Sequence, residues 1–379
     1  MMRVTLINLW DKGGMIHYFS QLTNALAKTE EVTVIIPDSA SSNYFNKNIN
    51  IKRIKVPTEA SLKELVSFPS KLIRIPFFLK TVRDTNPDVI HITSGHPWSF
   101  MAMPFLKKYK IFVTLHDPEP HVGEKHLRKI LSIRMSLKYA TKIFVHGKQL
   151  RNLLTNKISK NKIEIIPHGD YSFFTKWEDN SVHEERSVLF FGRILDYKGI
   201  QYLIQAEPLI AKEIEDIKII IAGKGNLRKY EKLIKNKNNF EIINEFIPDE
   251  KVARLFQRCA VVVLPYIDGT QSGIIPIAYS FKKPVIATNV GSIPEVVENG
   301  RTGYIIEPRN SKILAESITK LLKDDNLRKQ MGDNAYTKMK EELSWDKIAE
   351  KTVMAYKSVV RRGPSSGHGR CRGLCCRGK

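Results

Sequence analysis

The sequence predicts an α/β fold built from two doubly wound parallel sheets. Short apolar, β-branched runs alternate along the chain with segments of helical periodicity, and turn residues separate them. A polar, acidic and aromatic stretch without a sustained period, residues 169–185, divides this alternation into two halves and is the expected linker. Strands that alternate with helices form parallel sheets, because each helix carries the chain back across the sheet. Ligands of such sheets bind beyond the carboxyl ends of the strands.

Each predicted strand is a short apolar run. In the first domain, residues 1–168, strands are expected at residues 1–7, 32–36, 89–93, 111–115, 142–145 and 163–166. In the second domain, residues 186–344, they are expected at residues 188–191, 217–222, 240–243, 261–264, 285–287 and 303–306. A final helix is predicted over residues 345–362, and residues 363–379 form a basic tail that is expected to be disordered and appended. A metal site in that tail is disfavoured, because Cys371, Cys375 and Cys376 lack a partner cluster with zinc-like spacing.

The composition is that of an ordinary globular protein with a strong positive charge. Of 379 residues 42% are hydrophobic, but no apolar run is long enough to cross a bilayer and the first residues lack the layout of a signal peptide. Cys259 stands alone outside the tail, so no disulfide framework is expected, which fits a reducing cytoplasm. Six basic residues from Arg361 onward contribute to the net charge of +22, and removing these six charges leaves +16. Such a charge favours anionic partners, namely nucleotide sugars, acidic lipid surfaces or nucleic acid.

The strand predicted at residues 188–191 leads into Gly192-Arg193, with Lys198 at the start of the next helical segment. A guanidinium binds a pyrophosphate bidentately, an ammonium adds a point charge, and the N–H groups of a helix N-terminus favour negative charge. The spacing therefore predicts a pyrophosphate site, in which Arg193 and Lys198 would neutralise a departing diphosphate. Strand–Gly–Arg sequences also occur by chance, so the motif alone is a weak signal.

Two further glycine turns follow predicted strands. Gly13-Gly14 follows the first strand and precedes a helical pattern over residues 15–27, whose positive end points to the same place. Gly223 follows the strand at residues 217–222. Glycine lets a ligand approach the backbone closely, but a tight connection without a ligand explains either turn equally well.

His116 follows the strand predicted at residues 111–115 and is a candidate for contact with a sugar. At that edge its ring would hydrogen-bond a hydroxyl or stabilise developing charge, whereas the alternative is a structural histidine at the edge of the core. Asp117 would orient His116 or cap the next segment. His91 lies inside the strand at residues 89–93 and is expected to be an interior histidine with satisfied hydrogen bonds.

A polar loop after the strand at residues 261–264 forms the second strong feature. It presents Thr270, Gln271, Ser272, Gly273 and Ile274 at the start of a helix predicted over residues 275–281. Hydroxyl and amide groups near a helix N-terminus suit sugar hydroxyls or phosphate oxygens.

Two acidic residues stand at other connections. Glu295 would accept hydrogen bonds from hydroxyls at the rim of the same site, or cap a helix that follows it. Asp249 is predicted to be the N-cap of the helix that begins there, and it would also border a base pocket.

In this order, the motifs resemble glycosyltransferase family 4 over about residues 1–360. They are Gly13-Gly14, His116-Asp117, residues 166–170, Gly192-Arg193 with Lys198-Gly199, the loop before Lys283-Pro284-Val285, and Glu295 with Gly300 and Gly303. The resemblance implies a GT-B fold, in which two Rossmann-like domains face each other across a cleft and a final helix crosses back to the first domain. It also implies a metal-independent, retaining transferase without a cofactor, whose co-substrate is a UDP-, GDP- or ADP-linked sugar. By position, Arg193 and Lys198 match the diphosphate-binding pair, His116 matches the sugar-contacting histidine, and Gly13-Gly14 matches the phosphate-side loop.

One motif departs from the family's pattern. Many members carry two glutamates eight residues apart before the Lys-Pro-Val element, but those positions fall near Gly269 and on Ile277. The chain instead resembles a subgroup with a Thr-Gln-Ser-Gly loop, so contacts that rest on the two glutamates do not carry over. Asp268 would replace the first glutamate by a shift of one residue. A smaller departure is that the usual Pro-Asn-Gly element is Pro167-His168-Gly169.

Basic amphipathic segments of the first domain point to the side that takes the acceptor. Residues 61–83 and 125–138 mix lysine and arginine with leucine, isoleucine and other large apolar residues. Such faces can lie on an anionic membrane that holds a lipid-linked acceptor. The alternative is a solvated basic side over an ordinary core face.

These observations predict a cytoplasmic glycosyltransferase, peripheral at the inner face of a membrane if the basic segments bind lipid. It would transfer a hexose from a nucleotide diphosphate sugar to a glycan or lipid-linked acceptor. A catalytically silent GT-B protein that binds sugar nucleotides is the alternative suggested by the missing glutamates. A nucleic-acid-binding protein would explain the charge, but no recognised module or array of stacking aromatic residues supports it. A dehydrogenase is disfavoured, because no Gly-x-Gly-x-x-Gly follows the first strand.

Overall fold

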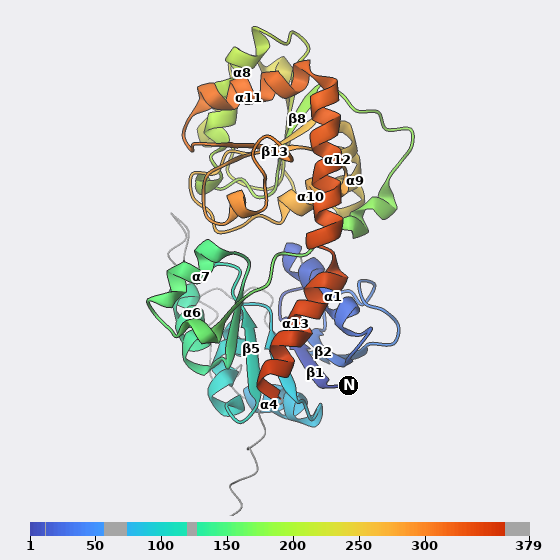
Figure 1. Cartoon of the computed structure of the whole chain (residues 1–379), viewed down its shortest axis with the longest axis vertical. Helices are drawn as coiled ribbons and strands as arrows, with labels where there is room; N and C mark the ends of the chain where they lie inside the picture. The colour runs from blue at the N-terminus through green and yellow to red at the C-terminus, as the bar shows by residue number, and fades with distance from the viewer. Residues whose placement is uncertain (12, 57–73, 120–126, 361–379) are drawn as a thin grey trace, which may run out of the picture.

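The computed structural model describes residues 1–11, 13–56, 74–119 and 127–360, which form two α/β domains stacked along the long axis of the molecule (Figure 1). All strand pairs in both sheets are parallel, which confirms the predicted α/β class. Residues 61–73 and 125–126 of the two basic segments and the tail at 363–379 lie outside the described residues. No helix in the described part of the chain is long and apolar enough to span a membrane.

The sheet of the first domain has seven strands in the order β3-β2-β1-β4-β5-β6-β7. These strands are β1 (Arg3–Ile7), β2 (Glu31–Pro37), β3 (Asn50–Ile54), β4 (Val89–Ile92), β5 (Lys110–Thr114), β6 (Lys142–Val145) and β7 (Ile163–Ile165). The strand order reverses between β1 and β4, so the loops that follow the neighbouring strands diverge there and leave room for a ligand.

The sheet of the second domain has six strands in the order β10-β9-β8-β11-β12-β13. They are β8 (Ser187–Phe191), β9 (Lys218–Ala222), β10 (Phe240–Ile243), β11 (Val261–Leu264), β12 (Val285–Thr288) and β13 (Gly303–Ile306). Its switch point lies between β8 and β11, which are the strands that precede Arg193 and the polar loop at residues 270–274. The topology therefore brings the two strong sequence motifs of this domain together.

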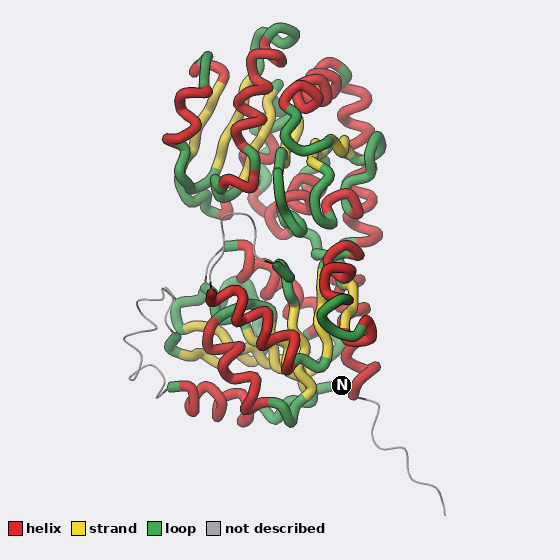
Figure 2. The backbone as a smooth tube through the Cα atoms, turned by 90° about the vertical axis from the view of Figure 1, so that its left-hand side faces the viewer, coloured by secondary structure: helices red, strands yellow, loops and turns green. Residues whose placement is uncertain are grey.

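Helices connect the strands and flank both sheets (Figure 2). In the first domain they are α1 (Gly14–Leu26), α4 (Ile75–Asp84), α5 (Pro97–Ala102), α6 (Leu127–Tyr139) and α7 (Lys148–Thr155), with 3-10 helices η1 (Met103–Leu106) and η2 (Lys160–Lys162). In the second domain they are α8 (Ile200–Ala211), α9 (Asp249–Arg258), α10 (Ile274–Ser280), α11 (Ser311–Lys323) and α12 (Asp325–Glu342). The 3-10 helices that follow β7 are η3 (Ser172–Trp177), η4 (Asp196–Lys198), η5 (Arg228–Leu233), η6 (Lys237–Asn239) and η7 (Ile293–Glu295).

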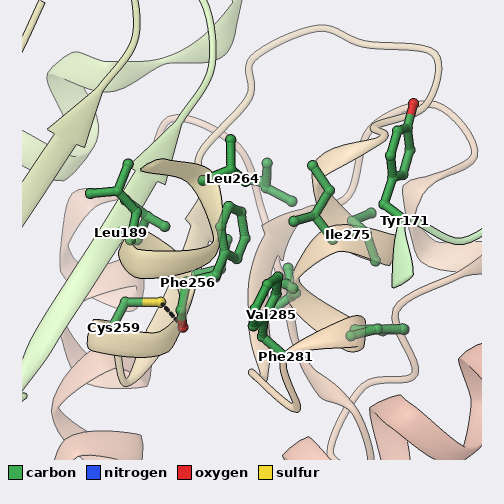
Figure 3. Packing of buried hydrophobic residues seen from close by; sticks show 14 of the residues in the cluster. Tyr171, Leu189, Phe256, Cys259, Leu264, Ile275, Phe281 and Val285 are labelled. Carbon is green, nitrogen blue, oxygen red and sulfur yellow. Dashed lines mark hydrogen bonds between the residues drawn. The ribbon is translucent and has the colours of Figure 1, made fainter. Parts of the chain in front are cut away.

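Each sheet separates two hydrophobic clusters, because successive side chains of a strand point to opposite faces. Figure 3 shows one cluster of the second domain, where Phe256 of α9 packs near Cys259 and Leu264. The Sγ of Cys259 donates to the carbonyl of Phe256 at 3.5 Å, and burial raises the pKa of this thiol to about 12. A neutral buried thiol of this kind is an unreactive part of the core.

The last helix, α13 (Trp345–Val360), leaves the second domain and lies on the first (Figure 1). The indole Nε1 of Trp345 donates to the carbonyl of Asp170 at 2.8 Å, where the chain passes between domains. Further along the helix, the Tyr356 hydroxyl lies 2.6 Å from Nδ1 of His91, whose Nε2 lies 2.8 Å from the Thr114 hydroxyl. His91 is therefore the satisfied interior histidine that the sequence predicts.

Two local features differ from the sequence analysis. The sequence does not predict β3, because this edge strand is mostly exposed and carries Lys52 and Arg53 in place of an apolar run. The expected linker contains η3, and Phe174 of η3 and its N-cap Tyr171 belong to a hydrophobic cluster of the second domain. Aromatic residues that lack a regular period in sequence are buried here through irregular backbone.

Candidate functional site

The loops that follow β8 and β11 lie side by side at the switch point of the second sheet. The backbone N–H groups of Ile267 and Asp268 donate to the carbonyl of Tyr197 at 2.7 and 3.4 Å. These bonds hold the loop that carries Arg193 and Lys198 against the loop at residues 265–274.

Lys198 and Arg193 flank one buried tyrosine. Lys198 is only 9% exposed, and its Nζ lies 5.1 Å from the ring centroid of Tyr266. Arg193 is exposed, but its charge is close enough to oppose the burial that raises the pKa of Tyr266. One ammonium held in place by packing and one accessible guanidinium make a positive site that suits an anion.

Gly192 is favoured by the backbone conformation of this loop. Its φ of +109° lies in the region that favours glycine, and an added Cβ would lie 2.9 Å from Nζ of Lys198. Gly223, at the end of β9, packs behind it: a Cβ there would lie 2.1 Å from the carbonyl oxygen of Gly192. The Gly223 turn thus supports the Gly192 loop through backbone contact.

The polar loop joins the second domain to the first. The hydroxyl of Thr270 donates to Oδ1 of Asp117 at 2.5 Å, so the residue next to His116 contacts this loop directly. The Ser272 Oγ accepts from the N–H of Ile274 at 3.3 Å and lies 3.3 Å from the Tyr266 hydroxyl. The buried Oε1 of Gln271 has no hydrogen-bond partner among the residues that the structure describes.

Tyr171 lies between the glycine turns of the two domains. Gly13 is the N-cap of α1, and the carbonyl of Gly14 accepts from the Tyr171 hydroxyl at 3.4 Å. Gly273, the N-cap of α10, faces the same ring, since an added Cβ would lie 3.4 Å from it. The structure therefore brings Gly13, Gly14 and Gly273 to one place in the junction between the domains.

Three histidines gather at the carboxyl edge of the first sheet. His116 follows β5, His146 follows β6 and His168 follows β7, and Nδ1 of His116 lies 2.9 Å from Nε2 of His146. The ring of Tyr18, from α1, packs edge-on against all three, with centroid distances of 4.8, 5.5 and 5.1 Å in that order. Neighbouring parallel strands end at the same edge, so this histidine cluster follows directly from the topology.

Burial keeps these histidines uncharged. It lowers the pKa of His116 to about 4 and that of His146 and His168 to about 3, with a further contribution from the neighbouring imidazoles. All three values lie well below neutral pH. Each ring therefore has one donating and one accepting nitrogen under ordinary conditions.

Glu295 caps a helix of the other domain. Its carboxylate oxygens accept from the backbone N–H groups of Lys148 and Gln149 at 2.8 and 3.0 Å, at the start of α7. The prediction that a helix follows Glu295 is wrong, because turns lead from it into β13. A carboxylate at a helix N-terminus is stabilised by the partial positive charge there.

Asp249 also joins the domains. The prediction that it is an N-cap is wrong by one residue: Pro248 is the N-cap, and Asp249 is the first residue of α9. Its carboxylate accepts from the Tyr44 hydroxyl at 2.9 Å and lies 3.1 Å from Nε2 of His17. Burial raises the pKa of Asp249, but these two hydrogen bonds outweigh it and bring the pKa below its ordinary value.

Two features of the site were not predicted from the sequence, namely the place of His146 and the contact between Asp117 and Thr270. For His146 a signal exists, because it directly follows a predicted strand, as His116 does. For Asp117 and Thr270, which are 153 residues apart, no local pattern is available. In the described part of the chain, no group of three or more histidine, cysteine, aspartate or glutamate residues could hold a metal ion.

Two family models match the chain, one for each domain. The model described as Glycosyltransferase Family 4 matches residues 12–169, and that described as Glycosyl transferases group 1 matches residues 173–338. The chain is a glycosyltransferase similar to family 4. The two matches meet where the glycosyltransferase passes from its first sheet to its second.

The curated relatives are distant. The uncharacterized glycosyltransferase MJ1178 of Methanocaldococcus jannaschii is 26% identical over 92% of this chain and 94% of its own length. A second protein of that organism, MJ1607, is 30% identical, but the match spans about half of each protein, 53% of this chain and 55% of the relative. The capsular polysaccharide biosynthesis glycosyltransferase CapM of Staphylococcus aureus is 26% identical over 63% of this chain and 67% of CapM.

Solved structures share the fold of the whole chain. Sucrose-phosphate synthase from Thermosynechococcus elongatus superposes with a TM-score of 0.76 at 19% identity, covering 96% of this chain and all of that one (100%). Anabaena HepE in complex with UDP-glucose gives 0.74 at 16% identity, covering 95% and 100%. At such identities the likeness concerns the fold, and it confirms the GT-B architecture.

Proposed function

We propose that this glycosyltransferase transfers a hexose from a nucleotide diphosphate sugar to a glycan or lipid-linked acceptor, with retention of the anomeric configuration. The observation that carries the proposal is the pair of Lys198 and Arg193 at the switch point of the second sheet. The polar loop that follows β11 at the same edge contacts Asp117 of the first domain, which lies next to His116 after β5. A positive site at this edge of a parallel sheet suits an anionic donor. Retention and the hexose rest on the resemblance to the family.

The diphosphate of the donor is proposed to bind to the second domain. Arg193 would bind its oxygens bidentately, and Lys198 would supply a fixed charge from its place beside Tyr266. Because Lys198 is held by packing, it would not need to reorganise as negative charge develops on the leaving diphosphate. Preorganised charge of this kind is usually the largest catalytic contribution and is worth roughly 3–4 kcal/mol per group.

The sugar is proposed to lie between the polar loop and the histidine cluster. Gln271 presents a buried oxygen without a partner among the described residues, and a ligand hydroxyl would satisfy it. His116 would hold another hydroxyl from the opposite side. Gly13 and Gly14 would border the phosphates, since their turn faces Gly273 across Tyr171.

The first candidate for the nucleotide is UDP. The structures of Anabaena HepE contain UDP or UDP-glucose, and a structure of Staphylococcus aureus TarM also contains UDP. Because these ligands belong to other proteins that share the fold, GDP and ADP sugars are included in the same test.

The acceptor side is proposed to be the first domain. CapM is named for capsular polysaccharide biosynthesis, and another relative from Staphylococcus aureus is a poly(ribitol-phosphate) alpha-N-acetylglucosaminyltransferase, 24% identical over 93% of this chain. By analogy, we infer that a glycan or a lipid-linked glycan is the acceptor here.

We also propose that the glycosyltransferase is cytoplasmic and binds an anionic membrane peripherally. Three large apolar side chains of the first domain are strongly exposed: Phe77 of α4 by 62%, Phe105 of η1 by 60% and Leu131 of α6 by 45%. Exposed basic residues lie on the same helices, including Arg74 at the start of α4 and Arg134 within α6. Apolar residues among basic ones are typical of surfaces that bind acidic lipids.

A catalytically silent protein that binds sugar nucleotides is the second candidate. It is favoured by one observation: Ile277, at the position of a family glutamate, is 5% exposed and packs in the core. A buried isoleucine cannot replace the contacts of a carboxylate. This candidate predicts donor binding without transfer or hydrolysis.

A thermal-shift screen against UDP-, GDP- and ADP-linked sugars tests donor binding, because a ligand that binds only the folded state raises the Tm. Transfer and hydrolysis assays with the stabilising donor then distinguish the two candidates. Stabilisation with turnover supports transfer, stabilisation without turnover supports the silent protein, and no stabilisation by any donor contradicts both.

The Arg193→Ala and Lys198→Ala variants test the site. Each is expected to lower kcat/KM by about 100-fold or more, because each removes a charge that stabilises the leaving diphosphate. Lys212→Ala is a matched control: Lys212 is an exposed lysine at the C-terminal end of α8, the opposite end of the helix from Lys198. Normal transfer by both site variants would contradict the assignment.

A further inference from the structure

A chain of three polar contacts runs through the histidine cluster. The Thr93 carbonyl lies 3.2 Å from Nε2 of His116, and Nδ1 of His116 lies 2.9 Å from Nε2 of His146. Nδ1 of His146 lies 2.9 Å from the carbonyl of Ile166. Both ends of this chain are backbone carbonyls, which can only accept hydrogen bonds.

The chemistry of the two histidines fixes how many N–H protons these three contacts share. Each of the three contacts needs one N–H group, but two neutral imidazoles carry only two. The neutral pair is therefore one proton short, and one contact must bring two bare acceptors together. Because burial holds the pKa of His116 at about 4 and that of His146 at about 3, the pair does not take up a third proton at neutral pH.

The distances indicate which contact lacks the proton. Ile166 lies 2.9 Å from His146, the usual separation for an N–H group donating to a carbonyl, so Nδ1 of His146 is the donor. Its Nε2 is then bare and accepts from Nδ1–H of His116. This leaves Nε2 of His116 bare, facing the Thr93 carbonyl at 3.2 Å, the longest of the three contacts.

We propose that His146 is a positioning residue, which holds His116 in the tautomer protonated on Nδ1 and leaves its Nε2 as an acceptor for a substrate hydroxyl. The inference deepens the proposed function and rests on it for the identity of the hydroxyl as that of a sugar. The tautomer of a histidine is set by the hydrogen bond that its other nitrogen makes. Here the carbonyl of Ile166 sets the tautomer of His146, and His146 in turn sets that of His116. A hydroxyl donated to Nε2 would replace the unfavourable contact with Thr93.

The other titratable groups around His116 are compatible with this arrangement. His168 donates from Nδ1 to the carbonyl of Gly169, which is 3.1 Å away, and Tyr18 packs edge-on with a pKa that burial raises. His91 is held by Tyr356 and Thr114. The carboxylate next to His116, that of Asp117, is paired with Lys129 at 3.1 Å and with Thr270.

The tautomer can be observed directly by long-range ¹H–¹⁵N spectra of the histidine rings, with His116→Gln to assign the signals among the ten histidines. At neutral pH we expect His116 to be protonated on Nδ1 and bare on Nε2. A spectrum with His116 protonated on Nε2 in the unsubstituted protein would overturn the proposal.

Two variants of His146 test its role. In His146→Phe, His116 loses the acceptor of its Nδ1–H, so its proton is expected to move to Nε2 and donate to Thr93. His146→Asn can still donate to Ile166 but is too short to reach His116, so the same move is expected in a less perturbed site. His168→Asn is the control, since it should leave the tautomer of His116 unchanged.

Transfer and donor binding separate this inference from the proposed function. Both His146 variants should lower kcat/KM by about tenfold, the effect of one lost hydrogen bond, while UDP should raise the Tm as in the unsubstituted protein. An unchanged tautomer in both variants, or a moved tautomer with normal transfer, would overturn the positioning role. The expected tautomers in a protein that transfers from no donor would leave the assignment standing and contradict only the proposed function.

Discussion

At the scale of single residues, the backbone conformation at Gly192 favours glycine and affects the site. Gly192 combines a φ of +109° with direct contact to the Lys198 ammonium, so it serves both the turn and the placement of a charge. Gly300 has a similar φ of +78°, but none of the residues that the structure describes lies within 4 Å of an added Cβ. Alanine variants of these two glycines can therefore be compared to separate the free-energy cost of backbone strain from the effect of displacing Lys198.

Gly192→Ala is expected to weaken donor binding as well as stability. A left-handed φ at a residue with a Cβ costs about 1–2 kcal/mol, and this cost should lower the free energy of unfolding of Gly192→Ala and Gly300→Ala alike. Only Gly192→Ala also moves Lys198, so it alone should lose the Tm increase given by the nucleotide diphosphate. Denaturant unfolding and thermal shifts measure the two effects, and equal donor binding by both variants would contradict this role of Gly192.

At the scale of elements, α4, η1 and α6 of the first domain each carry an exposed large apolar residue, namely Phe77, Phe105 and Leu131. Phe78 of α4 points the other way and is 1% exposed, so the helix has a buried and an exposed aromatic side next to each other in sequence. The exposed side is available to a membrane without any change in the core.

Replacing Phe77 and Phe105 by serine is expected to reduce sedimentation with anionic liposomes. The substitution removes two aromatic side chains that would insert among the lipids, while the basic residues stay in place. Because these side chains are already exposed, the Tm should change little. The liposomes should contain phosphatidylserine, with neutral liposomes as the comparison, and a protein that ends at Val360 excludes the contribution of the tail. Failure of the unsubstituted protein to sediment would contradict membrane binding.

The elements themselves were largely predictable from sequence, because buried parallel strands are continuous apolar runs. The strands β6, β10, β11 and β13 begin and end at the predicted residues. β3 could not be predicted in this way, because an exposed edge strand has no apolar run. Arg193 and Lys198 stand out in the sequence because one strand–turn–helix unit carries both. The contact between His116 and His146 arises from strand order, which local periodicity does not contain.

At the scale of the whole molecule, the two domains touch around the site, and the polypeptide passes between them twice at one place. The N–H of Asp170 donates to the carbonyl of Leu343 at 2.9 Å, so the two segments that pass between the domains are bonded to each other. Contacts between Asp117 and Thr270, and between α7 and Glu295, also hold the domains together. The structure is therefore a closed arrangement with one region that can act as a hinge.

Gly147, the N-cap of α7, allows this closure. Its φ of −168° is extended backbone that any residue adopts, so alanine would cause no local strain. However, an added Cβ would lie 2.1 Å from Oγ and 2.3 Å from Cβ of Ser292, and 2.9 Å from Oε1 of Glu295 in the other domain. Gly147→Ala should therefore force the domains apart, which small-angle scattering would measure as a larger radius of gyration. Donor affinity should fall if donor binding requires the closed form.

A compensating change makes this prediction specific to the contact between the domains. Ser292→Gly removes both atoms that the new Cβ would meet most closely, and the Ser292 hydroxyl has no hydrogen-bond partner among the described residues. The double variant Gly147→Ala/Ser292→Gly should therefore recover the radius of gyration and most of the donor affinity, whereas Gly147→Ala alone should not. If the single variant scatters like the unsubstituted protein, the close approach of Gly147 to Ser292 does not limit closure. If the double variant stays open, the alanine acts within the first domain, and the contact between Gly147 and the second domain is not what limits closure.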